Sequence, residues 1–91
     1  MILTIDIGNS TTKFGVFDDE KLVERLTIPT IRGKSADEIY ESIQNNLKQI
    51  FQAVIISTVV QELNESFAKL SETYFNCTPI FVNQDFHFGV Q

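Results

Sequence analysis

The residues most suited to chemistry form a short segment, residues 6–13, that directly follows the apolar run at residues 2–5. The segment supplies a carboxylate, a glycine, an amide, hydroxyls and a cation, which belong to Asp6, Gly8, Asn9, Ser10, Thr11 and Lys13. A carboxylate at a strand tip can hold Mg²⁺ through water, N–H groups of a tight turn can face phosphate oxygens, and a lysine can neutralise the remaining charge. The segment therefore indicates a site for the phosphates of a nucleotide.

The same segment also fits an ordinary hairpin turn. Glycine and asparagine accept positive φ, and an aspartate side chain accepts hydrogen bonds from the N–H groups of a turn. Because the motif is short, the elements around it must decide between a phosphate loop and a plain turn.

Composition narrows the classes of protein. With 91 residues, 43% of them hydrophobic, the chain predicts one small domain with a packed core. Its net charge of −5 and its seven scattered Lys and Arg residues argue against a nucleic-acid or anionic-membrane surface. No apolar run approaches the roughly 20 residues that span a bilayer. A single cysteine, Cys77, excludes an intramolecular disulfide, so we expect a cytoplasmic domain.

Other polar positions have weaker signals. Arg32 and Lys34 form the densest basic run, which predicts a solvated loop or, alternatively, a contact with a phosphate or a partner. Ser57 and Thr58 end an apolar run, where ligands of open α/β sheets bind, although such hydroxyls also cap the following helix. His87 has no second His and no Cys nearby, so we expect it on the surface.

The elements that must position these residues begin with strands. Apolar and β-branched residues predict strands at 2–7 and 14–17, and the alternation from Leu22 to Ile28 predicts a third, which Pro29 ends. Short connections favour antiparallel pairing of the three.

Helices and further strands follow. Ser35 and Glu38 form a capping box, which predicts a helix start. Apolar residues at helical spacing predict its buried stripe as Ile39, Ile43, Leu47 and Ile50. A second helix is predicted from the spacing of Leu63, Phe67, Leu70 and Tyr74, with Asn76 as its stop. Residues 53–57 predict a central strand covered on both faces, and residues 79–82 a fifth strand.

The resulting order is β-β-β-α-β-α-β, a mixed five-stranded sheet with helical crossovers in an α/β domain. This resembles a ribonuclease-H-like half-domain of the actin-like ATPase superfamily, which includes the sugar kinases. We expect residues 1–83 to form that half-domain and residues 84–91 to form a C-terminal extension towards a second domain.

Three segments narrow the resemblance to type III pantothenate kinases, a family that also contains Bvg accessory factors. Residues 1–10 resemble the family's Asp-x-Gly-Asn-Thr/Ser start, residues 54–60 its Val-Ile-Ser-Ser-Val-Val-Pro segment, and residues 74–82 its Lys-Tyr-Phe and Pro-Leu-Val-Val pair. The chain departs from the family at Gln61, where proline is usual, and at Phe88, where threonine is usual.

The resemblance implies transfer of the γ-phosphoryl group of ATP to pantothenate, the first step towards coenzyme A. It also implies Mg²⁺, a monovalent cation (K⁺ or NH₄⁺) and a homodimer. Asp6 would be the carboxylate on the Mg²⁺ side, acting through water. Gly8 and Asn9 would shape the turn, and the phosphate donors would be Ser10, Thr11 and Lys13.

The family's pantothenate-binding Gly-x-Asp-Arg segment and catalytic Asp-x-Gly-Thr motif do not occur in the 91 residues. By resemblance the chain corresponds to the N-terminal half, and we expect it to be inactive alone, with the general base supplied by the other half. The alternative is a non-catalytic accessory or interaction protein of the same fold.

Overall fold

A computed structural model of the chain describes residues 1–82. The expected extension at 84–91, together with His87 and Phe88, lies outside the described residues.

The elements follow the predicted order, with one short 3₁₀ helix added. Their bounds are β1 Ile2–Ile7, β2 Thr11–Asp18, β3 Lys21–Pro29, α1 Ala36–Ile43, β4 Ala53–Thr58, η1 Gln61–Leu63, α2 Asn64–Tyr74 and β5 Ile80–Val82. The strands form one sheet in the order β3-β2-β1-β4-β5. β1 pairs antiparallel with β2 and parallel with β4, while β2–β3 is antiparallel and β4–β5 parallel. The mixed five-stranded sheet is therefore confirmed.

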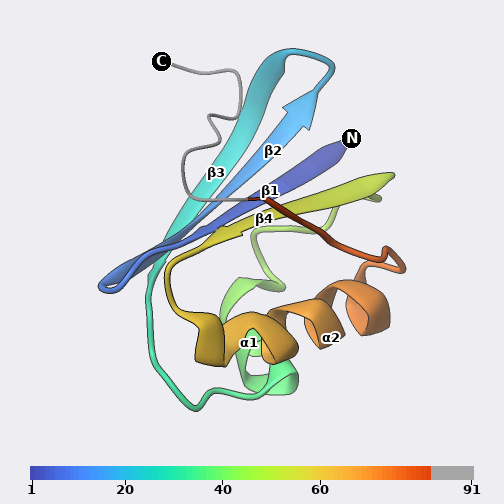
Figure 1. Cartoon of the computed structure of the whole chain (residues 1–91). Coiled ribbons are helices and arrows are strands. Elements are labelled where there is room, and N and C mark those ends of the chain that lie inside the picture. Colours follow the sequence, from blue (N-terminus) through green and yellow to red (C-terminus); the bar gives the residue numbers. More distant parts are fainter. Residues whose placement is uncertain (83–91) are drawn as a thin grey trace.

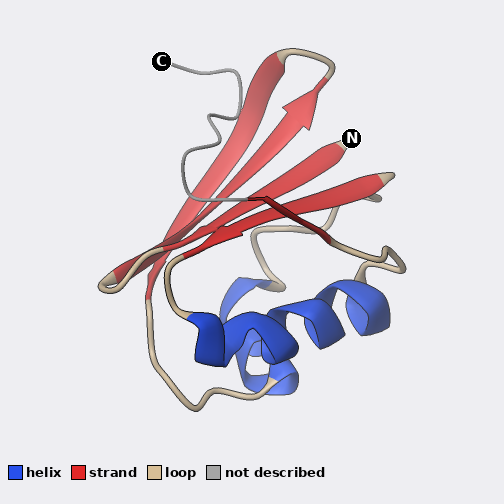
Figure 2. Cartoon of the chain, in the orientation of Figure 1, coloured by secondary structure: helices blue, strands red, loops and turns tan. Residues whose placement is uncertain are grey.

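Both α-helices lie on the same face of the sheet (Figures 1 and 2). The connections from β3 to β4 and from β4 to β5 advance across the sheet in the same direction between parallel strands. Right-handed crossovers then place both helices on one side. We call the opposite side, as far as residues 1–82 define it, the open face.

The expectation that β4 is covered on both faces is confirmed only in part, since on the side away from the helices Ser57 is buried but its neighbours are not. Val54 and Ile56 are fully buried towards the helices, whereas Ala53 and Ile55, which alternate with them, are only half-buried. The apolar run has the composition of a doubly covered strand, but the described helices supply a cover for one side alone.

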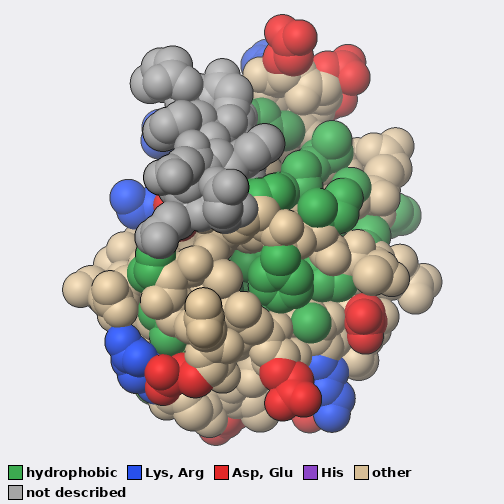
Figure 3. All heavy atoms as spheres, in the orientation of Figure 1, with side chains coloured by type: hydrophobic (Ala, Val, Ile, Leu, Met, Phe, Trp, Pro, Cys, Tyr) green, Lys and Arg blue, Asp and Glu red, His purple; other side chains and the backbone are tan. Residues whose placement is uncertain are grey.

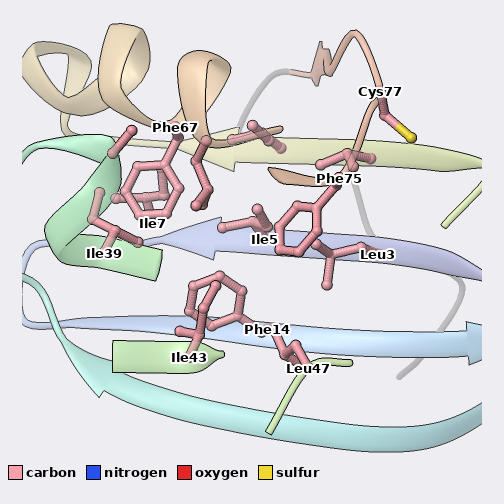
Figure 4. Packing of buried hydrophobic residues seen from close by; sticks show 14 of the residues in the cluster. Leu3, Ile5, Ile7, Phe14, Ile39, Ile43, Leu47, Phe67, Phe75 and Cys77 are labelled. Atoms are coloured by element: carbon pink, nitrogen blue, oxygen red, sulfur yellow. The ribbon is translucent and has the colours of Figure 1, made fainter. Parts of the chain in front are cut away.

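The core fills the space between the helices and one side of β1, β2 and β4 (Figure 4). Phe14 of β2 and Phe67 of α2 pack with ring centroids 6.4 Å apart. Cys77 is buried, and its thiol donates to the Phe51 carbonyl at 3.2 Å. This core packs against the helix-facing side of β1 and β2, so the turn between these strands is attached to a packed part of the sheet.

Helix α1 starts as predicted but ends earlier. Its N-cap is Ser35, and the capping box with Glu38 is complete, with bonds of 2.9 and 3.2 Å. The helix ends at Ile43, and a turn follows in which the Asn46 N–H donates to the Ile43 carbonyl at 3.0 Å. Two consecutive asparagines favour turns over helix, which explains the early end.

The predicted stripe is correct for its first three members and wrong for Ile50. Leu47 remains buried although it lies beyond the helix, whereas Ile50 is 89% exposed. The Leu47 N–H still donates to the Ile43 carbonyl at 3.0 Å, a helical bond that keeps Leu47 on the same face as Ile43. The helical spacing ends after this turn, so it no longer places Ile50 on that face.

Helix α2 ends where the sequence indicates. Asn76 adopts the left-handed φ of 58°, and the N–H groups of Phe75 and Cys77 both donate to the Ser71 carbonyl at 3.1 Å. Asparagine tolerates this conformation better than most residues, so it terminates the helix.

Candidate functional site

The candidate site is built on the turn between β1 and β2. Ile5 and Ile7 point into the core, so Asp6 between them projects from the opposite side of β1 and is exposed. The strand register places Lys13 of β2 directly opposite Asp6 on one side and Ser57 of β4 on the other. The carboxylate and the ammonium group therefore share the open face at the end of β1.

Gly8 opens the turn, and its role is steric. Its N–H donates to the Thr11 carbonyl at 2.9 Å, and a Cβ at this position would lie 3.0 Å from the same carbonyl oxygen. An ordinary hairpin turn would use positive φ at Gly8 or Asn9, but neither residue adopts it. The described residues with positive φ are Asp19, Gly33 and Asn76. Glycine at position 8 lets the backbone close on itself.

The turn leaves backbone donors available. Within residues 1–82, no protein acceptor takes the N–H of Asn9 or of Ser10. Both residues are exposed, and so is Thr11. N–H groups of a tight turn beside a lysine suit an anion with several oxygens, because no protein acceptor competes for their partial positive charges.

Hydrogen bonds join the C-terminal part of the turn, at Ser10 and Thr12, to the residue that follows β3. The Thr30 N–H donates to the Ser10 carbonyl at 2.9 Å. The hydroxyls of Thr12 and Thr30 hydrogen-bond at 2.8 Å, and Thr12 is buried. These contacts make the turn part of the sheet rather than a free loop.

A further contact, which the sequence interpretation missed, comes from Arg32. Its Nη2 donates to Asn9 Oδ1 at 3.0 Å, and its Nη1 forms a 2.7 Å ion pair with Glu62 Oε1. Lys34, in the same basic run, instead donates to Ser42 Oγ at 3.1 Å. The run is a surface loop, as expected, but Arg32 is engaged there with the turn.

Ser57 and Thr58 at the end of β4 differ from each other. Ser57 is 4% exposed and sits in register with Asp6, while Thr58 Oγ1 accepts the Val60 N–H at 3.0 Å. The capping interpretation is wrong for both residues, because the N-caps of η1 and α2 are Val60 and Leu63 and neither helix has a side-chain cap bond. The Thr58 hydroxyl instead closes a local turn as the chain leaves β4. Ser57 stays a candidate by position alone.

A groove of about 320 Å³ extends from Asp6 and Lys13 along the open face. Its lining is polar near the turn and apolar towards Phe17 and Leu22. Apolar side chains also reach the surface in other parts of the molecule (Figure 3). On edge strand β5, Ile80 and Phe81 are 55% and 42% exposed.

The residues present fit a hydrated magnesium ion. Within residues 1–82 no three His, Cys, Asp or Glu side chains come together as a metal cluster. Asp6 is the carboxylate that lines the groove beside the turn. Mg²⁺ keeps several waters and is commonly bound through one or two carboxylates plus phosphate oxygens. An exposed Asp6 beside free N–H donors meets that requirement.

No helix in the described part of the chain has the length and apolar character needed to cross a bilayer.

Comparison with known proteins places the chain in one protein family. Residues 2–91 match the family model for type III pantothenate kinase. The type III pantothenate kinase of Roseiflexus sp. (strain RS-1) is 39% identical over 90 residues, covering 91% of this chain and 35% of that protein. The one from Halalkalibacterium halodurans is 31% identical over 96 residues, covering 99% of this chain and 38% of that protein. The chain thus spans little more than a third of the length of these relatives.

The fold has a counterpart among solved structures. The ROK hexokinase from Thermus thermophilus superposes with a TM-score of 0.68 at 17% identity, covering 98% of this chain and 38% of that protein. At that identity the likeness concerns the fold, and it confirms the expected actin-like architecture. The family match over residues 2–91 makes this chain a member of the type III pantothenate kinase family, corresponding to the N-terminal portion of its relatives.

Proposed function

We propose that this chain is the phosphate-binding half of a type III pantothenate kinase, and that the turn between β1 and β2 binds the β- and γ-phosphates of Mg-ATP. The observation that carries the proposal is the register pair of Asp6 and Lys13 on the open face, next to a turn whose Asn9 and Ser10 N–H groups have no acceptor within residues 1–82. The family match supports ATP as the nucleotide.

Each residue has a defined role in this proposal. Asp6 orients waters of the Mg²⁺ ion, Lys13 neutralises charge on the phosphates, and Gly8 allows the close turn. The N–H groups of Asn9 and Ser10 contact phosphate oxygens, with the hydroxyls of Ser10 and Thr11 exposed beside them. In phosphoryl transfer most of the catalysis is positioning and charge neutralisation, which these groups supply for one side of the nucleotide.

The complete protein would phosphorylate pantothenate in the cytoplasm as a homodimer, with ATP, Mg²⁺ and a monovalent cation, K⁺ or NH₄⁺. Residues 1–83 would be its N-terminal half-domain and residues 84–91 the start of the connection to the second. The 91-residue chain alone binds nucleotide but does not turn over pantothenate, because the Gly-x-Asp-Arg and Asp-x-Gly-Thr motifs are absent from it.

Calorimetric titration of the chain with a non-hydrolysable ATP analogue and Mg²⁺ tests the binding. We expect saturable heat that Asp6→Asn removes and that Asp18→Asn leaves unchanged. Asp18 is a matched control because it is also an exposed strand carboxylate, at the opposite end of β2. No heat at millimolar nucleotide, or equal losses in the two variants, would contradict the proposal.

A coupled assay with pantothenate and Mg-ATP tests the proposal that the chain alone does not phosphorylate pantothenate. Turnover above background that Asp6→Asn abolishes would show that the chain is catalytically complete, against our expectation.

A further inference from the structure

Three segments that are distant in the sequence meet at the candidate phosphate loop. They are the β1–β2 turn with Asn9, the β3–α1 connection with Arg32, and the segment after β4 with Glu62. Figure 1 shows the β3–α1 connection running past the turn and past the chain that leaves β4. Arg32 is the side chain that joins all three.

The guanidinium of Arg32 makes a separate bond on each of its terminal nitrogens. Nη1 is 2.7 Å from Glu62 Oε1, and Nη2 is 3.0 Å from Asn9 Oδ1. A guanidinium is planar and its donors have fixed directions, so a carboxylate that anchors one nitrogen also sets the direction of the other. Lysine, a single point charge on a flexible stem, cannot reproduce both directions at once.

Arg32 contacts the turn at Asn9, the residue of the turn with the fewest other hydrogen bonds. Gly8 is held by its bond to Thr11, and Ser10 by its bond from Thr30. Asn9 lies between them, and within residues 1–82 its recorded hydrogen bond is the one to Arg32. The Asn9 and Ser10 N–H groups are the donors available to an anion, so the restraint on Asn9 determines where these donors point.

We propose that Arg32 is a positioning residue for the phosphate loop: anchored by Glu62, it holds the Asn9 side chain and keeps the turn's free N–H groups convergent. This proposal extends the proposed function and depends on it for its consequence on nucleotide binding. Arg32 acts through Asn9 and is not itself a ligand of the phosphates.

A purely structural ion pair would behave differently. Arg32 and Glu62 have side chains that are 51% and 57% exposed, and exposed pairs add little to global stability. Loss of Arg32 should therefore leave the unfolding temperature almost unchanged while the turn loosens. If loss of Arg32 lowered the unfolding temperature but left the turn unchanged, Arg32 would have only a structural role.

The first test needs no nucleotide. Backbone ¹⁵N relaxation of the chain reports the order parameters of Asn9 and Ser10. We expect values near 0.85 in the unaltered chain and below about 0.6 in Arg32→Ala. Arg32→Lys and Glu62→Gln should also lower them. Lys34→Ala is the matched control, because it removes a cation from the same loop that contacts Ser42 instead. Unchanged order parameters in Arg32→Ala would overturn the proposal.

The second test uses the non-hydrolysable ATP analogue with Mg²⁺. Arg32→Ala and Asn9→Ala should each weaken binding by about tenfold, and the double variant should lose no more than either single one, since coupled residues are not additive. Additive losses would identify Arg32 as a direct phosphate ligand and would contradict the positioning role. If the unaltered chain binds no nucleotide, the proposed function fails, while the order parameters still decide whether Arg32 positions the turn.

Discussion

Asp6 of β1 and Lys13 of β2 are directly opposed in the antiparallel ladder and project from the side of the sheet away from both helices. Cross-strand partners on one face have Cβ atoms about 5 Å apart, so the opposite charges can share one ligand. Among residues 1–82 the one ion pair joins Arg32 and Glu62, so Asp6 and Lys13 do not form a salt bridge with each other. Both groups are therefore available to a bound ion and its anion.

Lys13 should control nucleotide affinity through its charge. We expect Lys13→Ala to weaken binding of the non-hydrolysable ATP analogue by roughly tenfold, with a larger effect at low salt because exposed charges are screened. Lys21→Ala removes the same charge from the far end of β3 and should change the affinity little. Calorimetry at two salt concentrations measures both. Equal effects from the two variants would point to net charge rather than to a site.

Gly8→Ala should disturb the turn sterically. The added Cβ would lie 3.0 Å from the Thr11 carbonyl oxygen, which must shift and thereby weaken the Gly8–Thr11 hydrogen bond. We expect a loss of about 1 kcal/mol in the free energy of unfolding, together with weaker nucleotide binding. Urea denaturation and calorimetry give the two quantities. A variant that keeps both values would show that the turn has room for a side chain.

Leu47 and Ile50 should differ sharply, although the sequence places them on the same helical stripe. Leu47 is 2% exposed and Ile50 is 89% exposed. Leu47→Ala should lower the free energy of unfolding by about 3 kcal/mol, as for other buried leucines, and Ile50→Ala should change it by less than about 0.5 kcal/mol. Urea denaturation compares them. Similar losses would mean that α1 continues past Ile43.

Glu38 should make the stability of α1 depend on pH. The backbone N–H of Ser35 and then its hydroxyl stabilise the carboxylate, and Lys34 adds to this, so the pKa of Glu38 lies below its ordinary value. A carboxyl pKa that is lower in the folded chain gives stability above the unfolded-state pKa, and this stability is lost as pH falls through the folded-state pKa.

Replacement of Glu38 by glutamine should therefore reduce the loss of thermal stability between neutral and acidic pH. Glu41→Gln is the control, since this exposed carboxylate of the same helix takes no part in the capping box. Thermal unfolding across that pH range measures both variants. If the unfolding temperature of Glu38→Gln depends on pH as strongly as that of the unaltered chain, the capping box is not the cause of the pH dependence.

Local patterns predicted the elements well where a few neighbouring residues decide them. Ser35 and Glu38 started α1 as expected, and Asn76 ended α2. Short connections predicted the antiparallel pairing of β1, β2 and β3, which the structure confirms. The segment from Asp6 to Lys13 could be proposed as a phosphate-binding turn from sequence, because its chemical groups lie close together in the chain.

The end of α1 was less predictable because propensity and periodicity disagreed there. The apolar spacing continued to Ile50, whereas the asparagines after Gln44 favoured a turn, and the turn prevailed. One last helical hydrogen bond, from the Leu47 N–H to the Ile43 carbonyl, keeps Leu47 in the core, whereas Ile50 lies beyond it.

What the sequence by itself determined is which residues are proposed as the phosphate loop and which elements lie on either side of them, because these depend on contiguous residues. Only the tertiary structure decided that Asp6 and Lys13 face the side away from the helices, that Gly8 is needed for space rather than for positive φ, and that Arg32 reaches Asn9 and Glu62. The physical reason is separation: Arg32 lies 23 residues from Asn9 and 30 from Glu62, and only the folded sheet brings such groups within hydrogen-bonding distance.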